Sequence, residues 1–168
     1  MKKIISFLVL TIFILTSCEG PQGPPGYDGF DGEDGGLIVA NAFQIEVDFT
    51  PGNNYEVIEA YGFEVFPFDV TLVYNAWETD NFGNPIWRLL PQIVEFNEGQ
   101  LQYNYDFTQD DVRIFLDGTI DFGLLGNEWT QNQLFRVVVI PADNVDAVNI
   151  QNLDEVLKAG NITKFDQK

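Results

Sequence analysis

Histidine is absent from this 168-residue chain, cysteine occurs once, and both serines, Ser6 and Ser17, lie before that cysteine. The chain beyond Cys18 therefore has no serine, histidine or further cysteine. Nucleophilic catalysis by serine–histidine or cysteine–histidine pairs is excluded there, as are zinc sites built on histidine or cysteine. Only carboxylates, threonines, tyrosines and a few lysines remain as reactive groups, and the sequence predicts a protein that is not an enzyme.

Basic side chains are scarce. The chain has eight lysines and arginines against 26 aspartates and glutamates, which gives a formal charge of −18. Removal of a leader that contains Lys2 and Lys3 would make the remaining chain more acidic still. Nucleic-acid binding requires a basic surface, so no nucleic-acid partner is predicted. The same charge opposes adsorption of the chain onto an anionic membrane.

The first segment, MKKIISFLVLTIFILTSC, has a basic start and an apolar run over residues 4–15. That run is shorter than the ~20 residues of a membrane-spanning helix and is typical of a signal peptide, here residues 1–17. Its end, Leu15-Thr16-Ser17-Cys18, resembles the bacterial lipobox, which implies cleavage before Cys18 and acylation of Cys18. The alternative is an ordinary signal peptide with a chance cysteine. Two or three acyl chains anchor a protein stably, so the lipid bilayer is the predicted partner of Cys18.

Residues 18–36 carry the lipidated cysteine and a glycine at every third position from Gly20 to Gly35. This is the period of collagen, in which only glycine fits the axis of three chains. The run has five triplets, and its second half is acidic without any basic residue, so three copies side by side would repel one another. We expect a collagen-like spacer on a monomer. The alternative is a short trimer nucleated by neighbouring anchored chains.

Residues 37–168 are predicted to form one β-sandwich domain. In AFQIEVDF, Phe43, Ile45 and Val47 alternate with polar residues, and LQYNYDF and VRIFL alternate in the same way. A period of two is typical of half-buried strands. Further strands are expected near 55–60, 70–77, 86–95 and 132–140, and the apolar LFRVVVI is expected to be central. About seven strands favour an antiparallel, immunoglobulin-like sandwich in this all-β chain, with a small β-barrel as the alternative.

One short C-terminal helix is expected in NLDEVLKAG. Asn152 can cap it, Glu155 can complete a capping box, and Gly160 suits its end. We expect this helix to cover one end of the sandwich.

The leader, the acidic collagen-like stub, and the segments LPQIVEFNEGQLQYNYDFTQDDVRIFLDG and TQNQLFRVVVIPAD are similar to a family of short lipoproteins of Bacteroidota such as flavobacteria, uncharacterised and called only collagen-like. The resemblance covers nearly the whole chain. It implies an outer-membrane lipoprotein of a Gram-negative bacterium, and leaves open whether the protein faces the periplasm or the cell surface. It implies no catalytic activity.

The segment WETDNFGNPIW is the first candidate site. Trp77 and Trp87 flank a polar hairpin loop with Phe82 at its tip, and such aromatic side chains could stack on a sugar or grip a protein. The alternative is structural: both tryptophans pack into the sandwich and Phe82 folds back over its end.

The acids Asp106, Asp110 and Asp111 of DFTQDD are the second candidate site. Together with backbone carbonyls they could hold calcium, whereas the alternative is turn chemistry, with each aspartate accepting local N–H bonds. No other cofactor is predicted.

Two functions fit these observations. The first is a membrane-anchored structural or protein-interaction module of the cell envelope with an envelope protein as its partner, which a broad apolar patch on a sheet face would favour. The second is a surface-exposed binding module for glycan or another extracellular ligand, which exposed aromatic residues on the 77–87 hairpin would favour.

Overall fold

The computed structural model of the chain describes residues 40–145 and 148–168. The chain divides into two units, Met1–Asp34 and Gly35–Lys168, and the fold below belongs to the second. The predicted signal peptide, Cys18 and the glycine run lie outside the described residues. Within the described part, no helix is long and apolar enough to cross a membrane.

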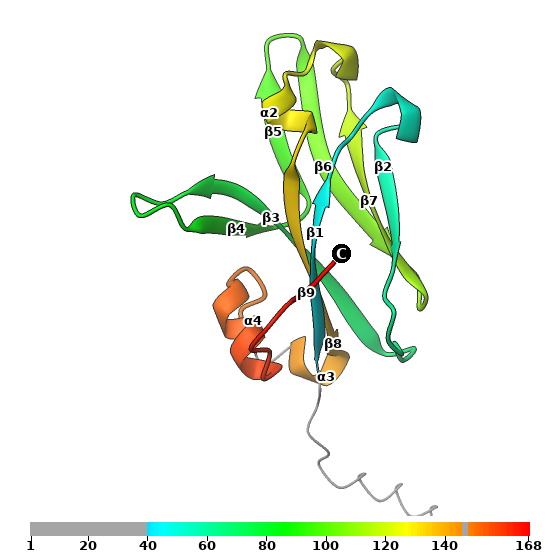
Figure 1. The fold of residues 1–168 in the computed structure, drawn as a ribbon, viewed down its shortest axis with the longest axis vertical. Coiled ribbons are helices and arrows are strands. Elements are labelled where there is room, and N and C mark those ends of the chain that lie inside the picture. The colour runs from blue at the N-terminus through cyan, green and yellow to red at the C-terminus, as the bar shows by residue number, and fades with distance from the viewer. Residues whose placement is uncertain (1–39, 146–147) are drawn as a thin grey trace, which may run out of the picture. The chain divides into compact units, whose positions relative to one another are not determined.

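Two open sheets form the described domain (Figure 1). One has the strand order β4-β3-β8-β1-β9 and the other the order β2-β7-β6-β5, and every pairing is antiparallel except that of β1 with β9. The strands are β1 (Asn41–Val47), β2 (Glu56–Ala60), β3 (Asp69–Thr79), β4 (Pro85–Leu89), β5 (Gln92–Phe96), β6 (Gly99–Phe107), β7 (Asp111–Gly118), β8 (Gln133–Pro141) and β9 (Asp166–Gln167). The predicted antiparallel sandwich is confirmed, and the alternative of a small closed barrel is wrong for the described residues.

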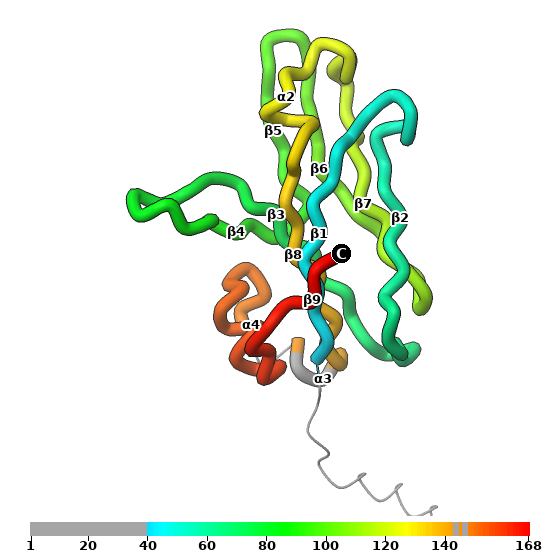
Figure 2. The backbone as a smooth tube through the Cα atoms, viewed as in Figure 1, coloured from blue at the N-terminus to red at the C-terminus, as the bar shows by residue number. Residues whose placement is uncertain are grey.

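The described residues form nine strands, two more than the seven expected. The strand expected over 86–95 is divided at Leu90-Pro91, where the chain leaves β4 in one sheet and enters β5 in the other. The two-residue strand β9 has no alternating pattern from which it could be recognised, and it lies beside β1 near the C-terminus (Figure 2). The likeness to an immunoglobulin domain is one of architecture, because β1 pairs with β8 instead of with the second strand.

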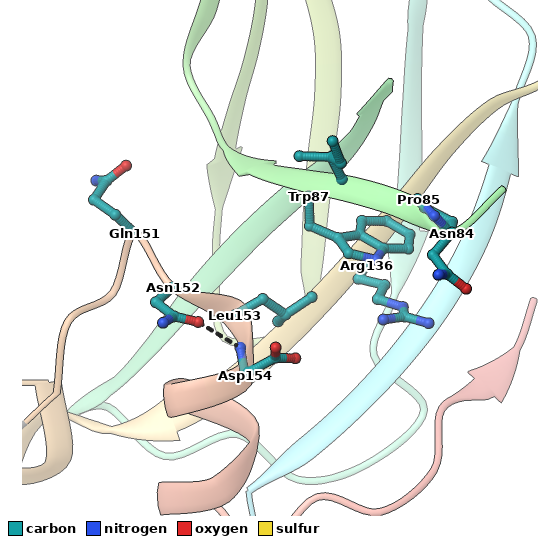
Figure 3. Close-up of a pocket in the computed structure, with 9 residues that line it drawn as sticks. Asn84, Pro85, Trp87, Arg136, Gln151, Asn152, Leu153 and Asp154 are labelled. Atoms are coloured by element: carbon teal, nitrogen blue, oxygen red, sulfur yellow. Dashed lines mark hydrogen bonds between the residues drawn. The ribbon is translucent and has the colours of Figure 1, made fainter. Parts of the chain in front are cut away.

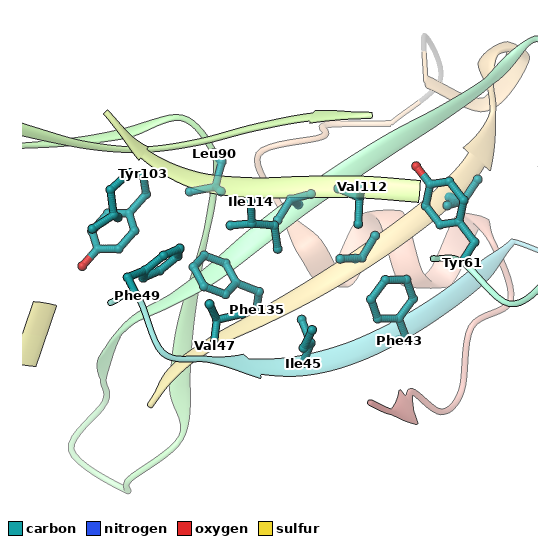
Figure 4. Packing of buried hydrophobic residues seen from close by; sticks show 14 of the residues in the cluster. Phe43, Ile45, Val47, Phe49, Tyr61, Leu90, Tyr103, Val112, Ile114 and Phe135 are labelled. Atoms are coloured by element: carbon teal, nitrogen blue, oxygen red, sulfur yellow. The ribbon is translucent and has the colours of Figure 1, made fainter. Parts of the chain in front are cut away.

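The main core lies between the sheets (Figure 4). Phe43, Ile45 and Val47 of β1 point into it, as their alternation predicts, and all three are buried. At one end of this core, Tyr103 meets Phe49 edge to face at a centroid distance of 6.1 Å, and Phe49 meets Phe135 in the same way. Such pairs add to the free energy that burial of the rings already contributes.

Strand β8 is buried on both of its faces. Val137 belongs to the core between the sheets, whereas Val138 and Ile140 belong to a second apolar cluster on the outer face of the five-stranded sheet. The sequence of a strand that is covered on both sides is a continuous apolar run instead of an alternating pattern. LFRVVVI is therefore central, as expected, with β3 on one side and β1 on the other.

Four short helical segments besides α4 connect the strands: the 3-10 turns Pro51–Asn53 and Phe122–Leu124, α2 (Asn127–Thr130) and α3 (Ala142–Val145). The predicted helix is present as α4 (Leu153–Ala159), with Asn152 as its N-cap. Its position differs from the expectation. Leu153 and Val156 pack on the outer face of the five-stranded sheet, in the second apolar cluster, so α4 covers a sheet face and not an end of the sandwich.

Candidate functional site

The β3–β4 hairpin places Trp77 and Trp87 on opposite faces of its strands. Trp77 packs against the core between the sheets, edge to face with Tyr103 at 6.0 Å. Trp87 lies opposite Ala76 in the pairing and packs against the outer cluster. Both indoles are half-buried. The two tryptophans therefore pack against the sandwich, as the structural alternative expects, and they do not form one common aromatic platform.

Phe82, at the tip of the hairpin, does not fold back over the sandwich. Its side chain is 91% exposed. The turn is held by Asp80, whose carboxylate accepts the N–H groups of Phe82 and Asn84 at 2.8 Å and the Asn84 side-chain amide at 2.9 Å. These hydrogen bonds, those of Asn84 foremost, lower the pKa of Asp80. Asp80 thus fixes a turn that holds Phe82 in solvent.

A groove of about 550 Å³ runs between the hairpin and the start of α4 (Figure 3). Strand β4 and the turn before it form one wall, with Trp87 as its large apolar side chain. The segment from Gln151 to Asp154 forms the other wall, and Arg136 of β8 lies between them. The lining residues are Asn84, Pro85, Ile86, Trp87, Arg136, Gln151, Asn152, Leu153 and Asp154.

Arg136 is held between two aromatic rings. Its guanidinium carbon lies 4.1 Å from the ring centroid of Trp87 and 4.2 Å from that of Phe165. Its Nε donates a hydrogen bond to Oε1 of Gln44, its partner in the β1–β8 pairing, at 3.1 Å. A cation over an aromatic face is attracted by the ring quadrupole, by about 1 kcal/mol or more when it is partly desolvated. The guanidinium is thus fixed by contacts that leave its two terminal NH₂ groups free of protein partners within the described residues.

The other two arginines of the chain are paired with acids. Arg88 bonds Glu78 at 2.6 Å, and Arg113 pairs with Asp106 and, at 3.4 Å, with Glu56. Over residues 40–145 and 148–168, no carboxylate lies within 4.0 Å of Arg136. Burial lowers the pKa of its guanidinium, and the charge of Asp154 across the groove partly opposes that effect. Arg136 is thus the one arginine of the chain without an ion pair among the described residues, although Asp154 faces it across the groove.

The second wall of the groove is positioned by hydrogen bonds. The hydroxyl of Tyr74 donates to the carbonyl of Ile150 at 2.7 Å and ties the segment before α4 to the sheet. Oδ1 of Asn152 accepts the N–H groups of Asp154 and Glu155 at 3.1 and 3.4 Å, which confirms the expected N-cap, and the side-chain amide of Asn152 donates to the Glu155 carboxylate at 3.0 Å. The expected capping box is not formed, because the backbone N–H of Asn152 donates to the carbonyl of Asn149 at 2.9 Å and not to Glu155. Leu153 anchors this first turn in the outer cluster.

The acidic loop forms a turn in which the hydroxyl of Thr108 accepts the local N–H groups of Asp110 and Asp111. This differs from the expected alternative, in which each aspartate would accept such bonds. Asp106 is bonded to Arg113, and the Asp111 carboxylate accepts the Thr108 hydroxyl at 2.8 Å. The backbone N–H of Asp110 donates to the same hydroxyl at 3.0 Å. Among the described residues, no group of three or more acid, histidine or cysteine side chains is placed to hold a metal ion. Calcium binding by Asp106, Asp110 and Asp111 stays a prediction.

Exposed apolar side chains do not gather on the open face of the four-stranded sheet. Ile58 is 60% exposed, and its partner across the pairing is Arg113, which in turn pairs with Asp106. Ile93 is 51% exposed and pairs with Gln102. Polar side chains therefore separate the apolar ones, and the described residues of this face show no broad apolar patch of the kind that marks a large protein interface.

No family model, no curated protein and no solved structure matches this chain. The resemblance to Bacteroidota lipoproteins accordingly stays a prediction, and the function has to be argued from the site itself.

Of the three aromatic candidates, the structure brings only Trp87 into the groove. Trp77 lies on the other face of the hairpin and Phe82 at its tip. Sequence reasoning missed Arg136, Asn152 as a groove residue, and Asp154. A signal for Arg136 was present: it is the one charged residue in the apolar run LFRVVVI.

Proposed function

We propose that this chain is a non-enzymatic lipoprotein, anchored in the outer membrane through acylated Cys18, that acts as an interaction module of the cell envelope and binds its ligand in the groove between Trp87 and Asp154. The lipobox-like order of residues in the leader supports the anchor. The acidic composition supports a partner other than nucleic acid or an anionic membrane surface.

The observation that carries the binding role is the groove. Its volume suits a small ligand or one unit of a polymer. It combines an indole, a guanidinium, three side-chain amides and one carboxylate, so it offers an apolar wall together with donors and acceptors. Pockets that bind polar ligands have this composition, with a few polar groups that fix orientation. Glycan is the ligand class that these lining side chains favour, because a sugar presents hydroxyls and an apolar ring face together.

The lining of the groove also supports a role in binding and not in catalysis. Hydrolysis of a glycoside ordinarily uses two carboxyl groups that flank the bond. Asp154 is the one carboxylate among the residues that line the groove. Neither serine nor histidine is present after Ser17, which leaves no conventional nucleophile and base for acyl transfer.

A second candidate function, attachment to an envelope protein as a structural part, is favoured by Phe82. A phenylalanine held in solvent by a rigid turn is suited to enter a pocket on a partner protein. This role would use the tip of the hairpin and leave the groove empty, so the two candidates can be separated by variants of different residues.

The experiment is purification of the full-length chain from its native host in mild detergent, followed by sugar analysis and mass spectrometry of what accompanies it. Gln151→Trp fills the groove from a side chain that is exposed. Ile93→Trp adds the same bulk to the other sheet and is the matched control. We expect carbohydrate with the wild type and with Ile93→Trp, and its loss with Gln151→Trp. A protein partner that survives Gln151→Trp and is lost with Phe82→Ser would instead establish the second candidate.

A further inference from the structure

Arg136 is a cation that the fold positions without an ion pair to any described carboxylate. Two aromatic rings and one glutamine hold its guanidinium in place, and the described residues provide no carboxylate within ion-pair distance. Arg88 and Arg113 show that acids are available to pair with arginines elsewhere in this fold. The arrangement at Arg136 therefore keeps a guanidinium available at the groove.

A fixed guanidinium with free terminal NH₂ groups is suited to a carboxylate. Its parallel N–H donors match the two oxygens of a carboxylate and bind it in a bidentate manner, and such charge-assisted hydrogen bonds are about twice as strong as neutral ones. Because Trp87 and Phe165 already fix the guanidinium, little side-chain entropy is lost when the anion binds. Partial burial strengthens the attraction further, since the charges are less well screened than in water.

The rest of the groove indicates that the carboxylate belongs to a hydroxyl-rich molecule. The amide of Gln151 can donate and accept, whereas the amides of Asn84 and Asn152 already bond Asp80 and Glu155 and each keep one N–H to donate. Asp154 offers a carboxylate that can only accept. A sugar hydroxyl can donate to Asp154, whereas a second carboxylate placed there would be repelled. An acidic peptide, with a carboxylate on each residue and few hydroxyls, suits this set less well.

Resting on the proposed function of the groove as a glycan site, we propose that the groove selects acidic carbohydrate, with the carboxylate of a uronic acid unit bound to Arg136 and the hydroxyls of that unit bound to Asn152 and Asp154. Trp87 forms the apolar wall beside the sugar ring (Figure 3). The negative charge of the whole protein weakens long-range attraction of such a ligand, so affinity depends on the short-range contacts with Arg136 and falls in high salt.

The test is calorimetric titration of the full-length chain, in detergent, with trigalacturonate and with the neutral galactotriose. Arg136→Gln removes the guanidinium, and Arg136→Lys keeps the charge without the bidentate geometry. Arg88→Gln is the matched control, because Arg88 lies in the same five-stranded sheet as Arg136, stacks on Trp77 at 5.2 Å and carries the same charge outside the groove lining. Near-ultraviolet circular dichroism checks that each variant is folded.

We expect trigalacturonate to bind at least tenfold more tightly than galactotriose. Arg136→Gln should weaken trigalacturonate binding by about 10- to 100-fold, Arg136→Lys by less, and Arg88→Gln by less than twofold. Equal binding of the two sugars that is indifferent to Arg136→Gln would overturn the selectivity and leave the groove as a glycan site. Binding of a tetraglutamate peptide in place of trigalacturonate, or binding of neither sugar while Gln151→Trp still strips carbohydrate in the native host, would overturn it as well.

Discussion

Asn152→Ala is the variant that tests most closely how the groove is built. The side chain of Asn152 accepts two backbone N–H groups at the start of α4, at 3.1 and 3.4 Å. Helix α4 has seven residues, and a helix so short does not persist on its own in water. It depends on this cap and on the packing of Leu153 and Val156 against the outer face of the sheet.

Loss of an N-cap side chain costs about 1 kcal/mol of the free energy of unfolding. One of the two hydrogen bonds is long and Asn152 is exposed to water, so we expect about 1 kcal/mol and not the upper end of the known range. For a domain of this size that corresponds to a fall in Tm of roughly 4 °C. Since the cap is local, the backbone amides of α4 should exchange faster with solvent. The exchange rate of the β8 amides should rise only as far as the loss in the free energy of global unfolding requires.

Chemical denaturation and hydrogen exchange of the full-length chain measure both effects. Asn152→Ser keeps an oxygen that can cap and should stay within a few tenths of a kcal/mol of the wild type. Gln151→Ala, at the preceding position, removes an exposed side chain and should change stability by less than ~0.5 kcal/mol. If Asn152→Ala is no less stable than Gln151→Ala, the cap does not hold this wall of the groove and the reasoning fails.

Four further predictions concern the anchor, the core, the boundary of the domain and the oligomeric state. Cys18→Ala should leave the chain unprocessed or release it into the soluble fraction, and normal processing with full membrane retention on fractionation would contradict lipidation at Cys18. Burial raises the pKa of Tyr61, Tyr74, Tyr103 and Tyr105 above the ordinary value of 10.0. The fold thus favours the neutral phenol. The contribution of these tyrosines to stability should be constant below pH 10, and stability should fall above it by up to about 1.4 kcal/mol per pH unit for each buried tyrosine. Ultraviolet titration that shows these tyrosines ionising at pH 10 in the folded protein would be incompatible with that burial. A variant that begins at Leu37 should unfold cooperatively. The unacylated full-length chain should be monomeric at micromolar concentration, because its acidic stub opposes trimers. Sedimentation equilibrium that shows a stable trimer, lost when residues 20–36 are deleted, would instead establish a working collagen segment.

Much of the fold could be predicted because side-chain alternation reports which residues face a core. Phe43, Ile45 and Val47 are buried as their spacing indicates, and so are Leu101 and Tyr103. Alternation does not report which strand is the neighbour, because that depends on contacts between distant segments. The sequence could therefore not predict three features: the pairing of β1 with β8, the division at Leu90-Pro91 and the strand β9.

The groove was less predictable than the fold for the same reason. Local chemistry marks Trp87 and the Asn152 cap, and the spacing of Asp80 from Phe82 and Asn84 is that of an Asx turn, which could have indicated that Phe82 is held in solvent. What fixes Arg136 comes from elsewhere in the chain: Trp87 lies 49 positions before it and Phe165 29 positions after it. No local pattern links these three residues, so their stack becomes visible only in the folded structure.

The most direct measurement of the central claim, that the groove beside Trp87 and Arg136 binds a ligand on a membrane-anchored chain, is photo-crosslinking in the native host. A photoreactive residue replaces Gln151 in the groove lining or, in the control, Ile93 on the other sheet. The account predicts a carbohydrate-containing adduct from position 151, recovered in the membrane fraction, and none from position 93. An adduct of the same kind from both positions, or from position 93 alone, would contradict it.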